Sequence, residues 1–379
     1  MEELSRELNL ASAGLARETL RYFENIYDFF DKFLQLRPDG GQRVRVVMFS
    51  SEKEFAPYQP SKTTAAYYVG GLARETIVIG QYSPAVQPVV VHEYTHLLVN
   101  QIGGYYPLWL NEGLAEFFST FERAGTEVRL GRVPGGLMDP NQTRLPLARI
   151  LEMDWESPEY RSKEAVGMVY AQSWALTHMV MVGERYRGRS AEFIKIVASG
   201  GASAEAFGTV YGRTVEQVQE DLASHFRRPT VAGLVIKLPP FDRVDATPIP
   251  VSESDVRVAL AELVSGENET VRMREAFAAL TGRSLAELEA RSLMEARAGN
   301  AAAAREHLSA AVSAGSQSPL LRSAAQPHTA GRVARRASLD DRDEASAEQP
   351  RRGSAAGGQV DGLTEVGEGA GHDAPDHGG

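Results

Sequence analysis

The spacing of apolar residues near the start of the chain predicts one long helix followed by short strands. Apolar positions recur at helical intervals, which indicates an amphipathic helix with one apolar face, formed by Leu4, Leu8, Leu15, Phe23, Ile26, Phe30 and Phe33. The turn sequence Pro38-Asp39-Gly40-Gly41 ends this helix. Two runs rich in β-branched residues, 43–49 and 76–79, then predict strands.

From Pro88 onward the pattern becomes helical. Helices are predicted over 88–101, 107–123, 162–183, 190–199 and 213–226, and a small hairpin is expected over 125–133. Strands that come early and helices that come late are typical of the α+β class. We therefore predict an α+β domain over residues 1–230.

The remaining residues predict a linker, a helical region and a tail. Prolines are frequent from 229 to 250, so we interpret 231–253 as a linker in which 231–238 can add one strand. Residues 254–315 follow as an α-helical region, with Ala-rich segments at 254–264, 270–281 and 285–312. Residues 316–379 contain no aromatic residue and few large apolar ones, so burial cannot offset their chain entropy. They are predicted to be a disordered, low-complexity tail.

The last helical segment breaks at Ala298-Gly299-Asn300, which predicts a helical hairpin. Its second half resembles half of a tetratricopeptide repeat, with Ala304, Leu308 and Ala311 at the small and large packing positions. A stable array of such repeats normally needs three or more of them, so an ordinary Ala-rich hairpin explains the pattern equally well.

Composition removes several classes of function. The chain has 379 residues and a net charge of -10, which argues against nucleic-acid binding as its main role. It has no cysteine, which excludes disulfides, zinc ribbons, iron–sulfur clusters and thiol catalysis. The acidic start MEELSRELNL is unlike a signal peptide, and no run of apolar residues is long enough to span a membrane. We expect a cytoplasmic protein, with an exported form left open if a leader precedes this start.

One segment carries the pattern of a metal site. His92-Glu93-Tyr94-Thr95-His96 is an H-E-x-x-H motif in a predicted helix. A spacing of four residues puts His92 and His96 on one face, one turn apart, where two imidazoles can hold the same zinc ion. Glu93 follows the first ligand directly, so its carboxylate can reach a metal-bound water without binding the metal.

The next predicted helix can complete this site. Fifteen residues after His96, the sequence continues Asn111-Glu112-Gly113-Leu114-Ala115-Glu116, and Gly103-Gly104 supply a bend between the two helices. Glu112 is the predicted third ligand, which leaves one coordination position open, as a catalytic zinc requires. Glu116 lies one turn later on the same face, where it can accept the free N–H of His92 and fix its tautomer.

HEYTH and NEGLAE together resemble the gluzincin metallopeptidases, the group of thermolysin and aminopeptidase N, over about residues 70–180. The resemblance implies a gluzincin-like domain with one zinc ion per chain, a peptide or protein substrate and Glu93 as the general base. It also implies that Tyr170, in Val169-Tyr170-Ala171, donates a hydrogen bond to the oxyanion. A packed core tyrosine is the alternative, because Trp174 and His178 continue the same stripe; His178 is interpreted as a core histidine.

Two departures from that family bear on the substrate. The loop between His96 and Glu112 is a few residues shorter than in either branch. Where aminopeptidases carry G-x-M-E-N, whose Glu holds the substrate's amine, this chain has Gly70, Gly71, Leu72 and Ala73; Glu75 fits only if the alignment is shifted. We therefore predict that 70–73 bind substrate by strand pairing, and that the protein is not a standard aminopeptidase.

The predicted function is thus a zinc-dependent metallopeptidase that uses Glu93 as general base. The competing prediction is a catalytically inactive, gluzincin-like binding module that recruits partners through the helices at 254–315. A repeat-style groove in these helices would favour binding of a protein partner, whereas helices packed over the metal cleft would favour a lid or substrate selector. Zinc-dependent hydrolysis of something other than a peptide is a third reading, because fold analogy alone points to peptides.

Overall fold

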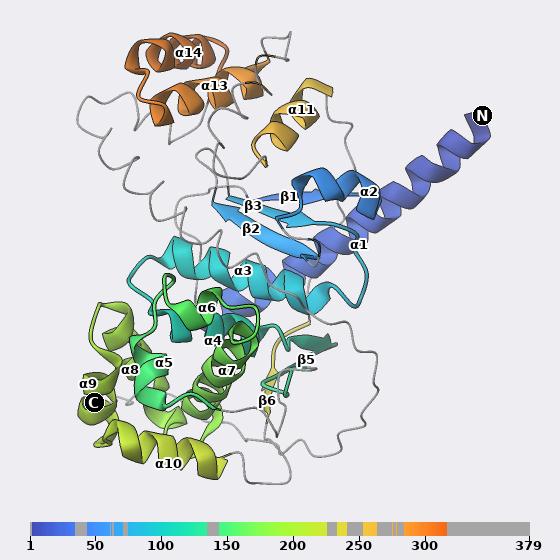
Figure 1. Cartoon of the computed structure of the whole chain (residues 1–379). Helices are drawn as coiled ribbons and strands as arrows, with labels where there is room; N and C mark the ends of the chain where they lie inside the picture. Colours follow the sequence, from blue (N-terminus) through green and yellow to red (C-terminus); the bar gives the residue numbers. More distant parts are fainter. Residues whose placement is uncertain are drawn as a thin grey trace, which may run out of the picture.

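The computed structural model describes residues 2–34, 44–60, 62, 64–70, 75–134, 144–225, 233–240, 253–263, 275, 278 and 284–316. Among these, the side chains of residues 2–13, 33–34, 253–255, 257 and 297 are not described. These residues form a mixed α and β structure with many helices and two small sheets (Figure 1). Among them, no helix combines the length and the apolar character that crossing a bilayer requires. The α+β arrangement of early strands and late helices is therefore observed, whereas the predicted domain boundaries stay predictions.

The first sheet has the strand order β1-β3-β2 and consists of β1 (Arg45–Met48), β2 (Ala66–Gly70) and β3 (Glu75–Ile79). β3 pairs in parallel with β1 and antiparallel with β2, with Tyr68 opposite Ile77. The strands predicted at 43–49 and 76–79 are confirmed. β2 was not predicted, because its sequence AYYVG lacks the alternation of apolar and polar positions that marks a half-exposed strand.

The two faces of this sheet pack against different parts of the chain. Tyr68, Ile77 and Ile79 join the main core, whereas Tyr67 and Val78 point to the opposite face, as the alternation of side chains along a strand requires. That opposite face packs against α2 (Glu52–Phe55), which is followed by the short 3-10 helix η1 (Ala56–Tyr58), and against Leu263. The sheet therefore separates the main core from the chain's later helices.

The main core holds three helices: α3 (Gln87–Ile102), α4 (Leu108–Phe118) and α7 (Val166–Val182). Every residue of α4 is buried. A Cβ atom at Gly113 would lie 2.1 Å from Thr177 Oγ1 and 2.5 Å from the Ser173 carbonyl oxygen, so only glycine lets α4 approach α7 this closely. Gly103 and Gly104 have φ values of 74° and 113°, so the predicted bend between α3 and α4 is confirmed and needs glycine.

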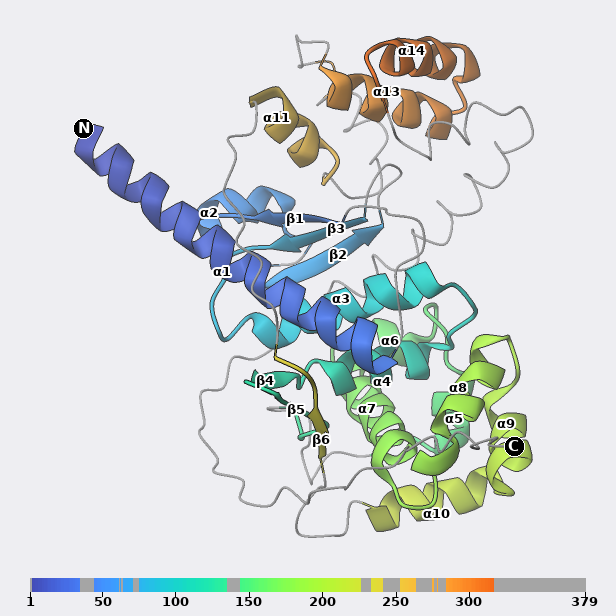
Figure 2. The ribbon, with the colours of Figure 1, turned by 180° about the vertical axis from the view of Figure 1, so that it is seen from behind.

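The N-terminal helix α1 (Glu2–Leu34) supports this layer from one side, as Figure 2 shows from behind. The ring of Phe23 contacts Tyr94 of α3, and the ring of Phe30 contacts Phe118 of α4, with centroids 5.8 Å and 5.0 Å apart. The predicted apolar face is thus confirmed from Leu15 to Phe30. The side chains of Leu4, Leu8 and Phe33, and the predicted turn at 38–41, lie outside the described residues.

α4 ends earlier than predicted. Its last residue is Phe118, whereas the sequence pattern predicted a helix to 123. The hydroxyls of Ser119 and Thr120 donate to the carbonyls of Glu116 and Phe117 at 2.7 Å, which satisfies carbonyls that a longer helix would have bonded itself. The residues freed in this way form the first strand of a hairpin.

The second sheet has the order β4-β5-β6 and is antiparallel throughout. β4 (Glu122–Ala124) and β5 (Glu127–Leu130) form a hairpin that begins before the predicted 125–133. β6 (Leu234–Lys237) adds the third strand, which confirms the strand predicted within 231–238. This part of the predicted linker is therefore attached to the hairpin.

Five further helices surround the core: α5 (Leu147–Glu152), α6 (Pro158–Arg161), α8 (Ser190–Ala198), α9 (Ser203–Tyr211) and α10 (Val215–His225), with the short 3-10 helix η2 (Arg187–Arg189) before α8. The helices predicted at 162–183, 190–199 and 213–226 are confirmed within a few residues. α5 and α6 were not predicted, because helices of one or two turns leave little periodicity to detect. α9 was not predicted either, although at nine residues it is as long as α8. α6 proves important, because it carries a residue of the functional site.

The later helices are α11 (Glu253–Ala261), α13 (Leu285–Arg297) and α14 (Ala301–Ser313). α13 and α14 form the predicted hairpin, and Ala304, Leu308 and Ala311 are buried in it. Figures 1 and 2 show the first sheet between α3 and α11, and Arg45 of β1 pairs with Glu262 just after α11. Of the predicted helix at 270–281, only Glu275 and Ala278 are described, both as helical; the predicted tail lies outside the described residues apart from Ser316.

Candidate metal centre

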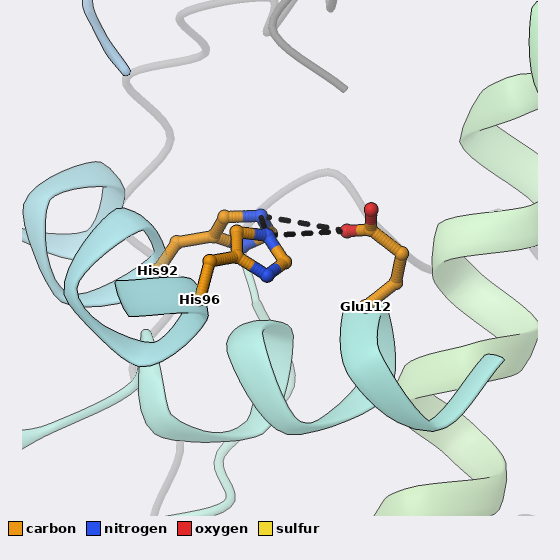
Figure 3. A group of neighbouring side chains, drawn as sticks. All are labelled: His92, His96 and Glu112. Atoms are coloured by element: carbon orange, nitrogen blue, oxygen red, sulfur yellow. Dashed lines mark hydrogen bonds and ion pairs between the residues drawn. The ribbon is translucent and has the colours of Figure 1, made fainter. Parts of the chain in front are cut away.

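Three side chains from two helices converge on one point. His92 and His96 of α3 point toward Glu112 of α4 (Figure 3). The Nε2 atoms of the two histidines are 3.0 Å apart, and Glu112 Oε2 lies 3.5 Å from His92 Nε2 and 3.7 Å from His96 Nε2. All three residues are buried, and the Glu112 side chain is 0% exposed. This group can hold a metal ion.

The spacing of the three atoms fits a small divalent cation. Points separated by 3.0, 3.5 and 3.7 Å lie on a circle of radius about 2.0 Å. Typical distances from zinc to a histidine nitrogen or a carboxylate oxygen are about 2.0–2.2 Å. One ion can therefore contact all three atoms without moving either helix. Two imidazoles and one carboxylate are also a donor set that zinc accepts.

Neighbouring acceptors orient both histidines toward that point. His96 Nδ1 lies 3.0 Å from Asn111 Oδ1, and His92 Nδ1 lies 3.4 Å from Glu116 Oε1. An acceptor beside Nδ1 favours the tautomer with hydrogen on Nδ1, which leaves the lone pair of Nε2 for a metal. Glu116 thus lies where the sequence pattern predicted it. Sequence analysis gave Asn111 no role, although its position directly before the predicted ligand Glu112 could have indicated a place in the site.

Glu112 is held in its ionised form by its neighbours. Burial by itself would raise the pKa of Glu112, but His96, His92 and a hydrogen bond from Tyr160 together lower that pKa below its ordinary range. The Tyr160 hydroxyl of α6 donates to Glu112 Oε1 at 3.0 Å, so Oε1 is engaged while Oε2 faces the histidines. Sequence analysis missed Tyr160, because no spacing rule connects the one-turn α6 to the metal motif.

Glu93 lies beside the ligands but faces a strand. Its side chain is half-buried, and its Oε2 accepts a hydrogen bond of 3.1 Å from the backbone N–H of Tyr68 in β2. Because this N–H points to α3, it is not used to pair with β3. The carboxylate is therefore oriented by the sheet while its neighbour in sequence, His92, faces Glu112.

Comparison with known proteins identifies a domain of unknown function. Residues 87–204 match the DUF1570 family, described as a protein of unknown function. The match begins at the first residue of α3 and contains all three candidate ligands, Glu93 and both tyrosines of the site. No curated protein and no solved structure matches the chain. The DUF1570 domain thus includes a buried cluster able to bind metal, and the comparisons assign it no activity.

Within the DUF1570 domain, Tyr170 of α7 lies next to the metal cluster. Its ring centroid is 6.2 Å from that of His92, and its hydroxyl is 3.1 Å from the hydroxyl of Tyr160. The side chain is also fully buried in the core. This position is compatible with both interpretations made from the sequence, a donor to the oxyanion and a packed core tyrosine. The side chain is packed among helices, and its hydroxyl lies beside the Tyr160 hydroxyl, which contacts Glu112.

The predicted substrate strand is only partly described. Gly70 is the last residue of β2 and pairs with Glu75, whereas Gly71, Leu72 and Ala73 lie outside the described residues. The Glu75 carboxylate is buried and accepts a hydrogen bond from the Tyr68 hydroxyl, which also accepts one from Asn100 at 2.9 Å. Glu75 therefore takes part in a buried hydrogen-bond chain at the end of the sheet.

His178 lies away from the three candidate ligands. It is fully buried, and its Nδ1 is 2.9 Å from Nε2 of His225 at the end of α10. Its ring also contacts Phe117 and Trp174. This placement agrees with the interpretation of His178 as a core histidine.

Removing the Tyr160 hydroxyl is expected to weaken metal binding. The Tyr160→Phe variant should bind zinc about 10- to 100-fold more weakly, because it leaves Glu112 Oε1 without this donor and lets the carboxylate turn. Competition with a chromogenic chelator measures the affinity. Tyr186→Phe is the matched control, because the buried Tyr186 also donates to a carboxylate, Asp221, at 2.8 Å outside the site. Equal zinc affinity of Tyr160→Phe and the control would contradict the assignment.

Proposed function

We propose that this protein is a zinc-dependent metallopeptidase whose metal is held by His92, His96 and Glu112. The supporting observation is the convergence of two imidazole nitrogens and one carboxylate oxygen on a single buried point. Three protein ligands leave a fourth position open, which is typical of catalytic rather than structural zinc sites. When bound there, zinc would supply Lewis-acid polarisation of a carbonyl and a water whose pKa approaches neutrality.

In this proposal Glu93 is the general base. It contributes no atom to the ligand cluster, and it directly follows the ligand His92 on the same helix. The N–H of Tyr68 holds one of its oxygens, so the other remains oriented for proton transfer. Glu93 would take a proton from the attacking water and deliver it to the leaving amine.

The hydroxyls of Tyr160 and Tyr170 would assist from the opposite side of the ligands. A phenolic O–H that points toward a developing oxyanion stabilises it. Tyr170 carries this role in our proposal. The single Tyr160 proton is donated to Glu112, so the Tyr170 O–H is the donor to Tyr160 and would turn from Tyr160 to the oxyanion. Tyr160 then positions both the ligand and the hydroxyl of Tyr170.

We further propose that a peptide substrate pairs with β2. This strand is outermost in the order β1-β3-β2 among the described strands, and its Tyr68 N–H already points toward Glu93. An extended peptide lying along that edge would pass directly beside the general base. Since Glu75 is buried and engaged by Tyr68, a free substrate amine is not the proposed anchor, and the proposed activity is not that of a standard aminopeptidase.

The alternative proposal is an inactive module that recruits a protein partner through its C-terminal helices. The α13–α14 hairpin exposes Val312 to 54%, an unusual position for a large apolar side chain. Leu263, which follows α11, packs on the face of the first sheet opposite to the main core, so this part of the helical region does not cover the ligands. The metallopeptidase proposal predicts peptide cleavage, whereas the inactive-module proposal predicts none.

Metal removal and reloading test the proposed activity. The full chain should cleave internally quenched peptides with both ends blocked, lose this activity after dialysis against dipicolinate, and regain it with one equivalent of zinc but not with magnesium. Peptides with free amino termini serve as the comparison for aminopeptidase activity. A zinc-loaded chain that cleaves no member of a diverse peptide library would favour the inactive module.

A further inference from the structure

A cavity lies beside α3, α4 and α8, and its lining includes none of the three candidate ligands. Its volume is ≈ 670 Å³, within the range of about 300–1,000 Å³ that is typical of small-molecule sites. Its walls come mainly from α3, α4 and α8, with Phe30 of α1 and Met181 of α7. Most of the lining side chains are apolar, among them Leu98, Val99 and Leu114. The cavity can therefore accept an aliphatic chain.

Helix geometry separates this cavity from the candidate ligands. Leu114 and Phe118 of α4 line the cavity, and each lies two residues after a carboxylate of the metal site, Glu112 or Glu116. Two residues correspond to a rotation of about 200° around an α-helix, so the cavity and the metal cluster are on opposite sides of α4. None of the three candidate ligands lines the cavity.

The hydroxyls of Thr95 and Ser199 in the lining are already engaged by backbone carbonyls. The Thr95 hydroxyl donates to the Val91 carbonyl at 2.8 Å, and the Ser199 hydroxyl donates to the Lys195 carbonyl at 2.7 Å. Both groups are therefore occupied by their own helices. This leaves the cavity wall apolar even where its residues are nominally polar.

Two polar groups in the lining remain available. Lys195 is exposed, and Tyr106 is half-buried, with its pKa raised by burial. Within the part of the chain that the structure describes, neither the Lys195 ammonium nor the Tyr106 hydroxyl has an ion-pair or hydrogen-bond partner. Both are donors, and one is a cation, so together they suit an anionic oxygen.

The surface near the cavity is also apolar. Ile102, which lines it, is 43% exposed, and Tyr105 in the α3–α4 connection is 64% exposed. An amphiphilic molecule entering the cavity would cover them.

We propose that this cavity binds a long-chain carboxylate, with its aliphatic chain between α3, α4 and α8 and its carboxylate held by Lys195 and Tyr106. The apolar lining accounts for the chain, and the two available donors account for an acid rather than an alcohol or an amine. This binding is independent of the proposed peptidase activity.

Displacement of a fluorescent fatty-acid probe from the full chain tests the proposal. Dodecanoate should displace the probe saturably at a stoichiometry of one, and dodecanol should bind at least about tenfold more weakly because it lacks the charge. Lys195→Gln should weaken dodecanoate about tenfold and leave dodecanol unchanged. Lys53→Gln is the matched control, an exposed lysine on α2 remote from the cavity.

A second variant tests the position of the chain. Ala198 is half-buried in the lining, so Ala198→Phe should fill part of the cavity and weaken both dodecanoate and dodecanol. A cooperative thermal unfolding transition like that of the parent shows that the variant is folded. The absence of saturable dodecanoate binding, equal binding by Lys195→Gln and the parent, or unchanged binding by a folded Ala198→Phe would each overturn the proposal.

Discussion

Replacing Glu93 by glutamine is expected to lower kcat/KM for peptide cleavage by at least about a hundredfold while zinc remains bound. Gln has nearly the same shape and keeps an acceptor oxygen for the Tyr68 N–H, but its amide cannot take up a proton. Loss of a general base typically costs about 10²–10⁴ in rate. Zinc content should stay at one per chain, because Glu93 contributes no atom to the ligand cluster.

The matched control for this prediction is Glu205→Gln. Glu205 is an exposed carboxylate in the first turn of α9, so the same chemical change there should leave both kcat/KM and zinc content unaltered. Stopped assays with a quenched peptide give the rates, and elemental analysis of the same samples gives the zinc content. A Glu93→Gln protein with the activity of the parent would rule out Glu93 as the base.

Removing the Glu112 carboxylate is expected to weaken zinc binding by at least about a hundredfold. Loss of a group that only orients a metal ligand typically lowers metal affinity about 10- to 100-fold. We expect a larger decrease in affinity when a ligand itself is lost. Glu112→Ala leaves two histidines whose Nε2 atoms are 3.0 Å apart and no carboxylate among the ligands. Zinc should raise the Tm of the parent and not that of the variant, because only tight binding to the folded state stabilises it.

Glu287→Ala is the matched control for Glu112→Ala. Glu287 of α13 is also buried and is paired with Arg291 at 3.0 Å, so its loss destabilises the hairpin without touching the metal cluster. Both variants keep His372 and His377, so adventitious zinc at those residues cancels in the comparison. If Glu112→Ala and Glu287→Ala retain equal zinc affinity, the three-residue site is wrong.

The candidate ligands were predictable because their positions depend on local geometry. A four-residue spacing puts His92 and His96 on one helix face whatever surrounds that helix. Glu112 and Glu116 repeat the same spacing on the next helix, and the glycines at 103 and 104 signal the bend between the two. These features require knowledge only of helix periodicity.

The partners of those ligands were not predictable, since they come from elements that the sequence pattern does not connect. Tyr160 lies on a one-turn helix, and the Tyr68 N–H belongs to a strand without alternating polarity. Asn111 directly precedes Glu112 in the sequence, but the histidine that it contacts depends on how α4 is oriented about its axis against α3. Long-range packing sets that rotation, and it leaves no periodic signal.

By itself, the sequence determined the early strands, the late helices and the residues able to bind one metal ion. Only the tertiary structure decided that these residues meet, with α4 pressed against α7 at Gly113, where a Cβ would clash with Thr177 and Ser173. It also decided that Tyr160, Asn111 and Tyr68 surround them and that a cavity opens on the other side of α4. The physical reason is that periodicity specifies which face of a helix is buried, whereas close packing specifies its neighbours.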